Sequence, residues 1–196
     1  MKTLAYPLLF LLLVSFTNTS TVNKHKTIFI SPKSELEIVG STNVSTFTCL
    51  FNVKNLNKPL RIDYWEGDDL IRFQKSTLVL DNTFFDCGGK GINKDFHDLL
   101  KTKVYPQILL TLKEIKKKAI ADNKVEALVE IQIAGISRSY IVDVEAKQEG
   151  DLHLNGNLKL NITDFNLEAP KKILGLIVVS EEIEIIFKLI VGEEKG

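Results

Sequence analysis

The chain has 196 residues, which is enough for one domain with a substantial hydrophobic core. Lys and Arg together number 25 and so do Asp and Glu, so the formal net charge is zero. A neutral chain has no overall field that would attract nucleic acid or an anionic membrane surface, and a hydrophobic content of 44% is too high for intrinsic disorder.

The N-terminus has the pattern of a secretory signal peptide. Lys2 precedes an apolar stretch, residues 4–16, that is too short to span a bilayer comfortably. We predict that residues 1–20 are removed, with an uncleaved anchor helix as the alternative. No later apolar segment is long enough to cross a membrane. We therefore expect a periplasmic or secreted protein without permanent membrane insertion.

Apolar and polar residues alternate from residue 25 onward, as in strands with one buried face. In the first half, the alternation predicts strands over residues 27–31, 35–39, 47–53, 59–64, 70–75 and 77–85. Residues 65–69, Trp-Glu-Gly-Asp-Asp, have the composition of a hairpin turn between two of these strands.

One short helix interrupts the strands. It is predicted over residues 93–101, with Asn93 as its N-cap and with Phe96, Leu99 and Leu100 on its inner face. After Pro106 the alternation resumes and predicts strands over residues 107–112, 125–133, 136–144, 152–162 and 183–191.

These elements predict an all-β protein. Many long strands with one polar face would expose edges and apolar surface as an open sheet, and closure into a barrel removes both problems. We predict an antiparallel barrel of about eight strands, whose interior is filled by side chains or holds one small ligand. A β-sandwich explains the alternation nearly as well.

The chain contains two cysteines, Cys49 and Cys87. In an oxidising compartment such a pair is expected to form a disulfide. The alternative is two buried free thiols, and a redox-active pair is disfavoured because there is no Cys-x-x-Cys spacing.

No catalytic pattern stands out. His25, His97 and His153 are far apart and none has a second histidine or a cysteine at a metal-ligand spacing. Gly-Gly-Lys-Gly at residues 88–91 lacks the Walker pattern and indicates a turn. We therefore expect no enzymatic activity, no metal and no cofactor.

The region around the helix resembles a known family. Asp-Phe-His-Asp-Leu-Leu-Lys at residues 95–101, followed by Val-Tyr-Pro-Gln-Ile at 104–108, is similar to the helix block of the YceI-like family. Residues 41–47, 134–138 and 183–191 resemble its early strand, a later hairpin and its closing strand. The cysteines resemble a cysteine-bearing branch, and the early segment lacks a histidine that many members have there.

The resemblance implies a lipocalin-like barrel that encloses a long polyisoprenoid chain. The function would then be non-enzymatic binding, transport or storage of a long apolar lipid, an isoprenoid, with Arg138 reaching its polar head group. The alternative is a structural or protein-interaction barrel with a filled core; a homodimer stays open. The residues proposed to contact the lipid are Phe47, Phe51, Ile108, Leu110, Val129, Ile131, Arg138, Tyr140, Val142, Leu158, Leu160 and Phe187.

These expectations divide the chain into four parts. Residues 1–20 form the signal peptide, 21–32 an N-terminal segment with a possible first strand, 33–191 the YceI-like barrel domain and 192–196 a C-terminal tail.

Overall fold

A computed structural model describes residues 23–117, 123–172 and 176–193. The signal peptide predicted for residues 1–20 lies outside the described residues, as does most of the predicted C-terminal tail.

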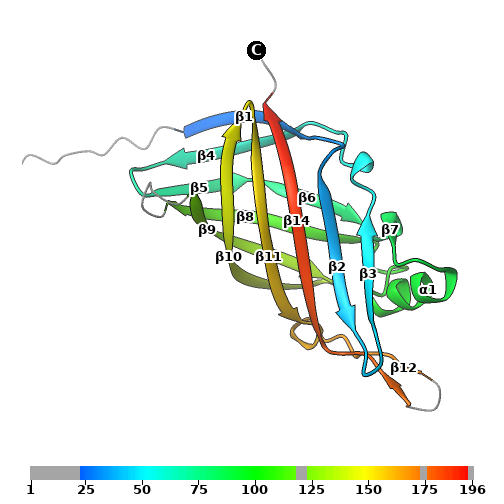
Figure 1. The fold of residues 1–196 in the computed structure, drawn as a ribbon. Coiled ribbons are helices and arrows are strands. Elements are labelled where there is room, and N and C mark those ends of the chain that lie inside the picture. Colours follow the sequence, from blue (N-terminus) through cyan, green and yellow to red (C-terminus); the bar gives the residue numbers. More distant parts are fainter. Residues whose placement is uncertain (1–22, 118–122, 173–175, 194–196) are drawn as a thin grey trace, which may run out of the picture.

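Eight antiparallel strands form a closed ring (Figure 1). In order of pairing they are β1 (Asn23–Ile30), β4 (Leu60–Glu66), β5 (Leu70–Lys75), β8 (Gln107–Lys117), β9 (Lys124–Ile133), β10 (Ile136–Glu149), β11 (Asp151–Asn161) and β14 (Glu182–Glu193). The ring closes where Ile28, Phe29 and Ile30 of β1 pair with the end of β14. The predicted antiparallel barrel is confirmed, and β1, which precedes residue 33, is one of its strands.

Further strands extend the wall at one end of the barrel. Residues 184–188 of β14 pair with β2 (Glu35–Ser41), which continues through β3 (Thr46–Phe51) to β7 (Phe85–Asp86). On the other side β6 (Thr77–Asp81) pairs with β8. The wall therefore consists of the eight-strand ring and the added strands β2, β3, β6 and β7. In Figure 1, β1, β4 and β5 run across the end of the barrel opposite to these added strands.

The remaining elements lie mostly at the ends. They are helix α1 (Lys90–Leu99), the 3-10 turns η1 (Val53–Asn55), η2 (Asn82–Phe84) and η3 (Ile162–Phe165), and the two-strand hairpin of β12 (Lys171–Lys172) and β13 (Ile177–Val178). Helix α1 lies beside β3 and β7, and the hairpin projects from the lower end of the barrel (Figure 1).

The predicted start of the helix is wrong. Helix α1 begins at Lys90 after Gly89, and Asn93 lies within it. The Asn93 side chain instead accepts a hydrogen bond from the Cys87 amide at 2.6 Å and donates one to Asp86 at 3.0 Å. Asn93 thus binds the chain that leads into the helix, a role that its residue type shares with an N-cap.

The strand predicted over residues 77–85 is interrupted. The Asp81 carboxylate accepts a hydrogen bond from the Thr83 amide at 2.9 Å, which starts η2 at Asn82. Such a local side-chain bond competes with the sheet ladder. The chain therefore turns between β6 and β7.

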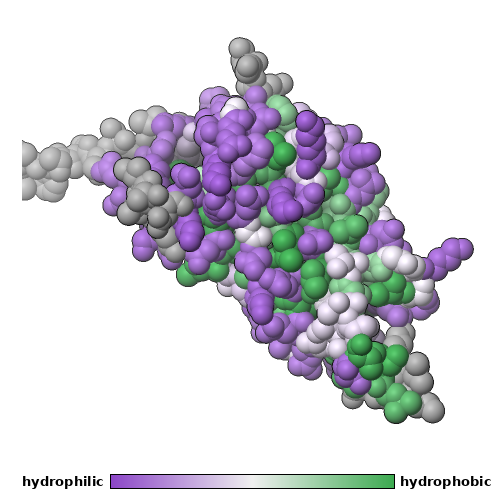
Figure 2. Space-filling model, viewed as in Figure 1, coloured by the Kyte–Doolittle hydropathy of each residue, from purple (hydrophilic) through white to green (hydrophobic). Residues whose placement is uncertain are grey.

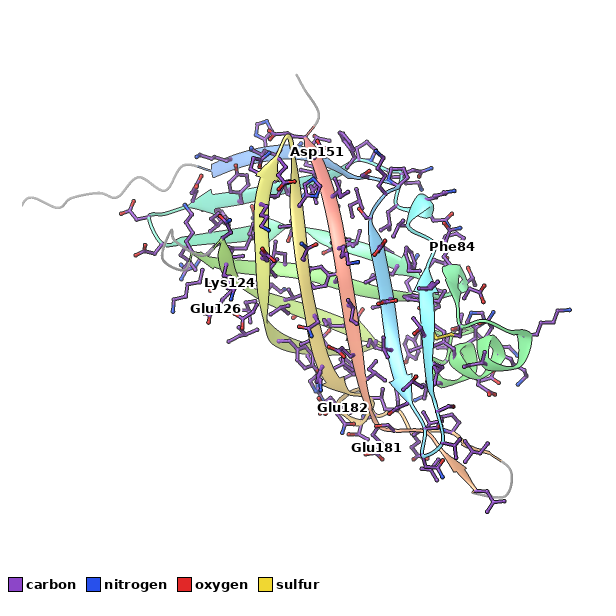
Figure 3. The ribbon with its side chains drawn as sticks, viewed as in Figure 1. Phe84, Lys124, Glu126, Asp151, Glu181 and Glu182 are labelled. Carbon is purple, nitrogen blue, oxygen red and sulfur yellow. A yellow bond between two sulfur atoms is a disulfide. The ribbon has the colours of Figure 1, made fainter. Side chains whose placement is uncertain are left out.

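The two faces of the barrel wall differ as the alternation predicts. Inward residues such as Ile38, Ile131 and Leu160 are less than a tenth exposed and form one main core. Charged residues such as Lys124 and Glu182 lie on the outside (Figure 3). Much of the surface seen in Figure 2 is hydrophilic, with an apolar area near the projecting hairpin.

Candidate functional site

The barrel contains a cavity of about 260 Å³. Its lining comes from β2, β3, β6 to β11, β14, α1 and η3, together with loop residues next to them, and no described residue of β1, β4 or β5 contributes. The cavity therefore lies in the part of the barrel that the extra strands and the helix complete. Its volume is slightly below the roughly 300–1,000 Å³ typical of small-molecule sites.

The lining is almost entirely hydrocarbon. Apart from disulfide-bonded Cys49, the only polar side chains that the described residues contribute to it are those of Ser76 and Ser180. The Ser76 hydroxyl donates to the Leu112 carbonyl, and the Ser180 hydroxyl accepts from the Glu182 amide. Since both hydroxyls are already bonded to the backbone, the cavity offers few polar contacts and suits an apolar ligand.

The cavity is elongated along the strands. Ile183, Ile185, Phe187 and Leu189 of β14 all line it, and this run of inward residues spans about 20 Å of strand. Leu167 and Ser180, which lie outside the strands, also line it. A cavity lined along this much of one strand favours an extended chain over a compact ligand.

Eight of the twelve residues proposed from the sequence line the cavity. They are Phe47, Ile108, Leu110, Val129, Ile131, Val142, Leu158 and Phe187. Their strands lie on different sides of the barrel, and the alternation alone placed them on its inner face.

Phe51, Leu160, Tyr140 and Arg138 are not among the lining residues. Phe51 packs with its ring centre 4.9 Å from that of Phe85, and Leu160 is buried in the main core. These two side chains fill the structure around the cavity and do not border it.

The side chains of Tyr140 and Arg138 have polar partners outside the cavity. The Tyr140 hydroxyl donates to Asp164 at 3.1 Å, and burial, with that bond, raises the pKa of Tyr140 to about 12. Arg138 alternates in step with the inward residues of its strand, but its side chain is exposed. Its guanidinium donates to the Ser137 carbonyl at 2.9 Å. A long cationic side chain near the start of a strand reaches solvent in this way.

Several lining residues were not proposed as contacts. They include Leu36 and Ile38 of β2, Leu78 and Leu80 of β6, and Phe96 and Leu99 of α1. The apolar inner face of the helix and the alternation in β2 and β6 indicate that these residues face inward. What the sequence lacked was the pairing that brings these elements together.

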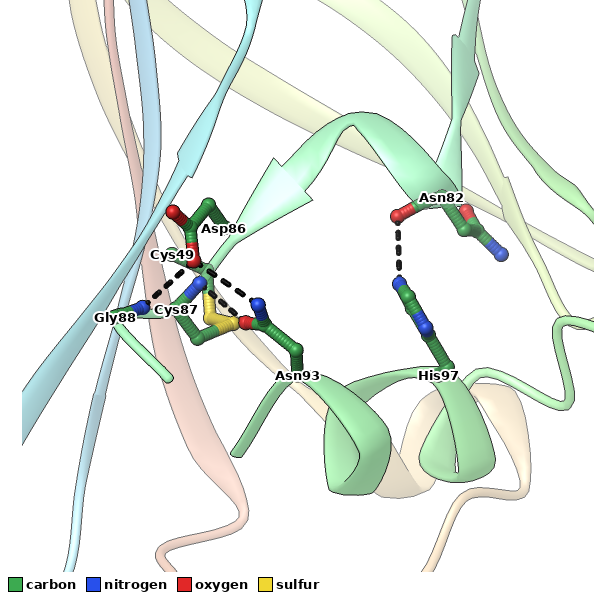
Figure 4. The surroundings of a disulfide bond; sticks show 7 residues. All are labelled: Cys49, Asn82, Asp86, Cys87, Gly88, Asn93 and His97. Atoms are coloured by element: carbon green, nitrogen blue, oxygen red, sulfur yellow. Dashed lines mark hydrogen bonds between the residues drawn. A yellow bond between two sulfur atoms is a disulfide. The ribbon is translucent and has the colours of Figure 1, made fainter. Parts of the chain in front are cut away.

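A disulfide joins Cys49 of β3 to Cys87, three residues before helix α1 (Figure 4). The helix is held further by Asn93 and by His97, whose Nε2 donates to the Asn82 carbonyl at 3.2 Å. Phe96 packs with its ring centre 5.2 Å from that of Phe85. These contacts fix the helix where its apolar face completes the cavity wall.

Within the described residues, no three His, Cys, Asp or Glu side chains are grouped so that they could hold a metal ion. In the same part of the chain, no helix has the length and apolar character needed to cross a membrane.

An antiparallel barrel with an apolar interior cavity defines a class of small barrels able to enclose one ligand, the architecture of lipocalins. Within that class, the chain belongs to the YceI-like family, because the sequence model of the YceI-like domain matches residues 37–191. The resemblance seen at the helix block is thereby confirmed. No curated protein sequence matches the chain.

Solved structures share the fold at low sequence identity. BcnA of Burkholderia cenocepacia is 22% identical, with a TM-score of 0.58 over 82% of this chain and 96% of that one. A polyisoprenoid-binding domain of Saccharophagus degradans is 16% identical, with a TM-score of 0.63 over 87% of this chain and 100% of that one. The YceI protein of Campylobacter jejuni is 21% identical, with a TM-score of 0.50 over 63% of this chain and 74% of that one.

Proposed function

We propose that this protein binds a long apolar lipid, an isoprenoid, inside the barrel and carries or stores it without chemical change. The observation that carries the proposal is the elongated cavity of about 260 Å³ with its hydrocarbon lining. The Saccharophagus degradans protein of the same fold is a polyisoprenoid-binding domain, which supports the same ligand class.

The size of the cavity weighs against a barrel that serves only as a structural or protein-binding scaffold. At about 24 cal/mol per Å³, a dry and empty cavity of this volume costs on the order of 6 kcal/mol. That is comparable with the roughly 5–15 kcal/mol of net stability of a whole domain. Filling the cavity with an apolar chain recovers this free energy through burial of apolar surface.

Binding in this cavity would depend on shape and burial. Each square ångström of apolar ligand surface removed from water contributes about 25 cal/mol, and part of this is lost because a flexible chain becomes ordered. The polar head of the lipid would have to lie outside the hydrocarbon lining. The Cys49–Cys87 disulfide fits an oxidising compartment, and we propose that the protein acts in the periplasm or outside the cell.

Mass spectrometry of the purified protein tests the proposal. In native spectra we expect one lipid per chain, and after solvent extraction we expect that lipid to be identified as an isoprenoid. Delipidated protein should take up prenyl alcohols to saturation at the same stoichiometry. Protein that carries no lipid and shows no saturable uptake would contradict the proposal.

A further inference from the structure

Three glycines of the barrel each lie opposite a phenylalanine on the neighbouring strand. The pairs are Gly40 with Phe47, Gly156 with Phe187, and Gly192 with Phe29. A Cβ atom placed on these glycines would lie 2.3, 2.5 and 2.4 Å from the nearest ring carbon. Each ring therefore covers the backbone of its glycine so closely that no side chain fits beneath it.

Two of these rings lie inside the barrel and one lies outside. Phe47 and Phe187 line the cavity, whereas Phe29 is 42% exposed on the outer face. Directly paired residues of antiparallel strands point to the same face of the sheet, so Gly40 and Gly156 face the cavity as well. The same packing thus occurs in two different surroundings within one molecule.

Covering a glycine with an aromatic ring has a structural benefit in either place. Glycine weakens a strand because it gains no side-chain packing and loses more conformational freedom on folding. A ring from the next strand restores packing at that position. This benefit applies equally to all three pairs.

Inside the cavity the packing has a second consequence. A ring that lies against the glycine backbone is held close to the wall, where any other residue would place its own side chain. The space that the ring would otherwise occupy then belongs to the cavity. The two inner glycines therefore widen the cavity at the positions of Phe47 and Phe187.

The two inner pairs lie at different heights along the cavity. Phe187 pairs with Leu36 of β2, and Gly40 is four residues farther along the same strand, which is about 13 Å. A chain that fills the cavity would have to pass both rings.

We propose that Gly40 and Gly156 are specificity-determining positions, which keep Phe47 and Phe187 against the wall and so allow one long lipid chain to extend past both rings. The proposal rests on lipid binding as the proposed function and adds to it the positions that set the length of chain accepted.

The variant Gly40→Ala is the most direct test. Within 4 Å, the three nearest atoms to the added methyl group all belong to the Phe47 ring, and Gly40 does not have the positive φ that would strain an alanine. The ring must leave the wall, and the cavity is the space open to it. We expect the affinity for solanesol, a long prenyl alcohol, to fall at least about tenfold, with a smaller loss for farnesol.

Gly192→Ala provides a matched control. It forces the same kind of contact with a phenylalanine ring, that of Phe29, but on the outside of the barrel. Both variants should lower the melting temperature, while only Gly40→Ala should lower the affinity for solanesol. The double variant Gly40→Ala/Phe47→Leu should regain binding because leucine lacks the ring that enters the cavity.

The outcomes separate this proposal from the proposed function. If the wild-type protein binds neither alcohol, lipid binding fails, and a crystal structure of Gly40→Ala still decides whether the Phe47 ring has moved into the cavity. If the wild-type protein binds both, the proposal is overturned by unchanged solanesol affinity in Gly40→Ala, or by an equal loss in Gly192→Ala.

Discussion

Neighbouring residues on one strand can have opposite roles in this barrel. Val142 of β10 lines the cavity and is 5% exposed, whereas the preceding residue, Ile141, is 69% exposed. Both are β-branched and both suit a strand. Their difference lies only in the face of the wall that each occupies, so the pair offers a test of where the ligand lies.

Val142→Phe should fill part of the cavity and weaken lipid binding by about tenfold or more, since a hydrophobic pocket is sensitive to single added groups. The added ring should cost no more than about 1–3 kcal/mol of stability. Ile141→Phe, the control, should leave affinity unchanged and stability within about 0.5 kcal/mol. Titration of the delipidated variants with a fluorescent prenyl probe checks this, and equal losses in both variants would place the ligand elsewhere.

Among the elements, helix α1 is the one most dependent on long-range ties. Its residues Phe96 and Leu99 border the cavity, yet the helix is not part of the sheet and does not share in the backbone hydrogen bonds that join the strands. The disulfide at its start closes a loop with a sequence separation of 38 residues, for which chain entropy gives a stabilisation of about 4 kcal/mol.

The double variant Cys49→Ala/Cys87→Ala should lose about 4 kcal/mol of unfolding free energy or somewhat more, because the unfolded chain regains its loop entropy and the loss of two buried sulfur atoms leaves unfilled space. Amide hydrogen exchange should rise most in α1, because the helix loses its covalent attachment to β3. Urea unfolding and exchange mass spectrometry measure the two effects. Protection of α1 at the wild-type level would show that side-chain packing alone holds the helix.

The sequence predicted most strands but not all of their limits, and β8 shows why. Alternation points Ile108, Leu110 and Leu112 inward, then fails, so the predicted strand ended at Leu112. In the structure β8 continues to Lys117 because the register shifts between Leu112 and Glu114. A residue added by such a bulge reverses the parity, and Ile115 then packs with Leu112 in the same apolar cluster.

The candidate site was predictable in part for the same reason. Parity identified Ile131, Val142 and Phe187 as inward residues, and all three line the cavity. Parity does not tell how far along the barrel an inward residue lies, so it could not separate Phe51, which packs outside the cavity, from Phe47, which borders it. That distinction depends on strand pairing over long sequence distances.

On the scale of the whole molecule, the closed ring and the cavity depend on each other. An open sheet with this inner face would expose both its edges and its apolar residues to water. Closure through β1 and β14 removes the edges of the eight-strand ring, and the added strands β2, β3 and β6 complete the wall around the cavity. The closed wall therefore surrounds more space than the inward side chains fill, and the space that remains is the apolar cavity.

Charged side chains also connect neighbouring strands of the ring. The Glu66 carboxylate, at the end of β4, accepts hydrogen bonds from Lys24 of β1 at 2.8 Å and from Lys117 of β8 at 3.0 Å. These bonds lower the pKa of Glu66 from 4.5 to about 2. One carboxylate thus connects three strands of the ring.

Glu66→Gln should lower stability by no more than about 1 kcal/mol, because a partly exposed carboxylate is screened by solvent. The pKa of Glu66 is lower in the folded protein than in the unfolded chain, so the unfolded chain takes up the proton first as the pH falls. The contribution of Glu66 to stability is therefore complete above pH 4.5 and is lost as the pH falls toward 2. Urea unfolding at several pH values should therefore show a stability difference between wild type and variant that shrinks over this window, and that shrinks in high salt as well.

Glu182→Gln, which removes a pair with Lys159 at 3.6 Å on the exposed outer face, is the control and should show a smaller difference. A difference for Glu66→Gln that does not change with pH would mean that packing of the side chain, and not its charge, holds the three strands together.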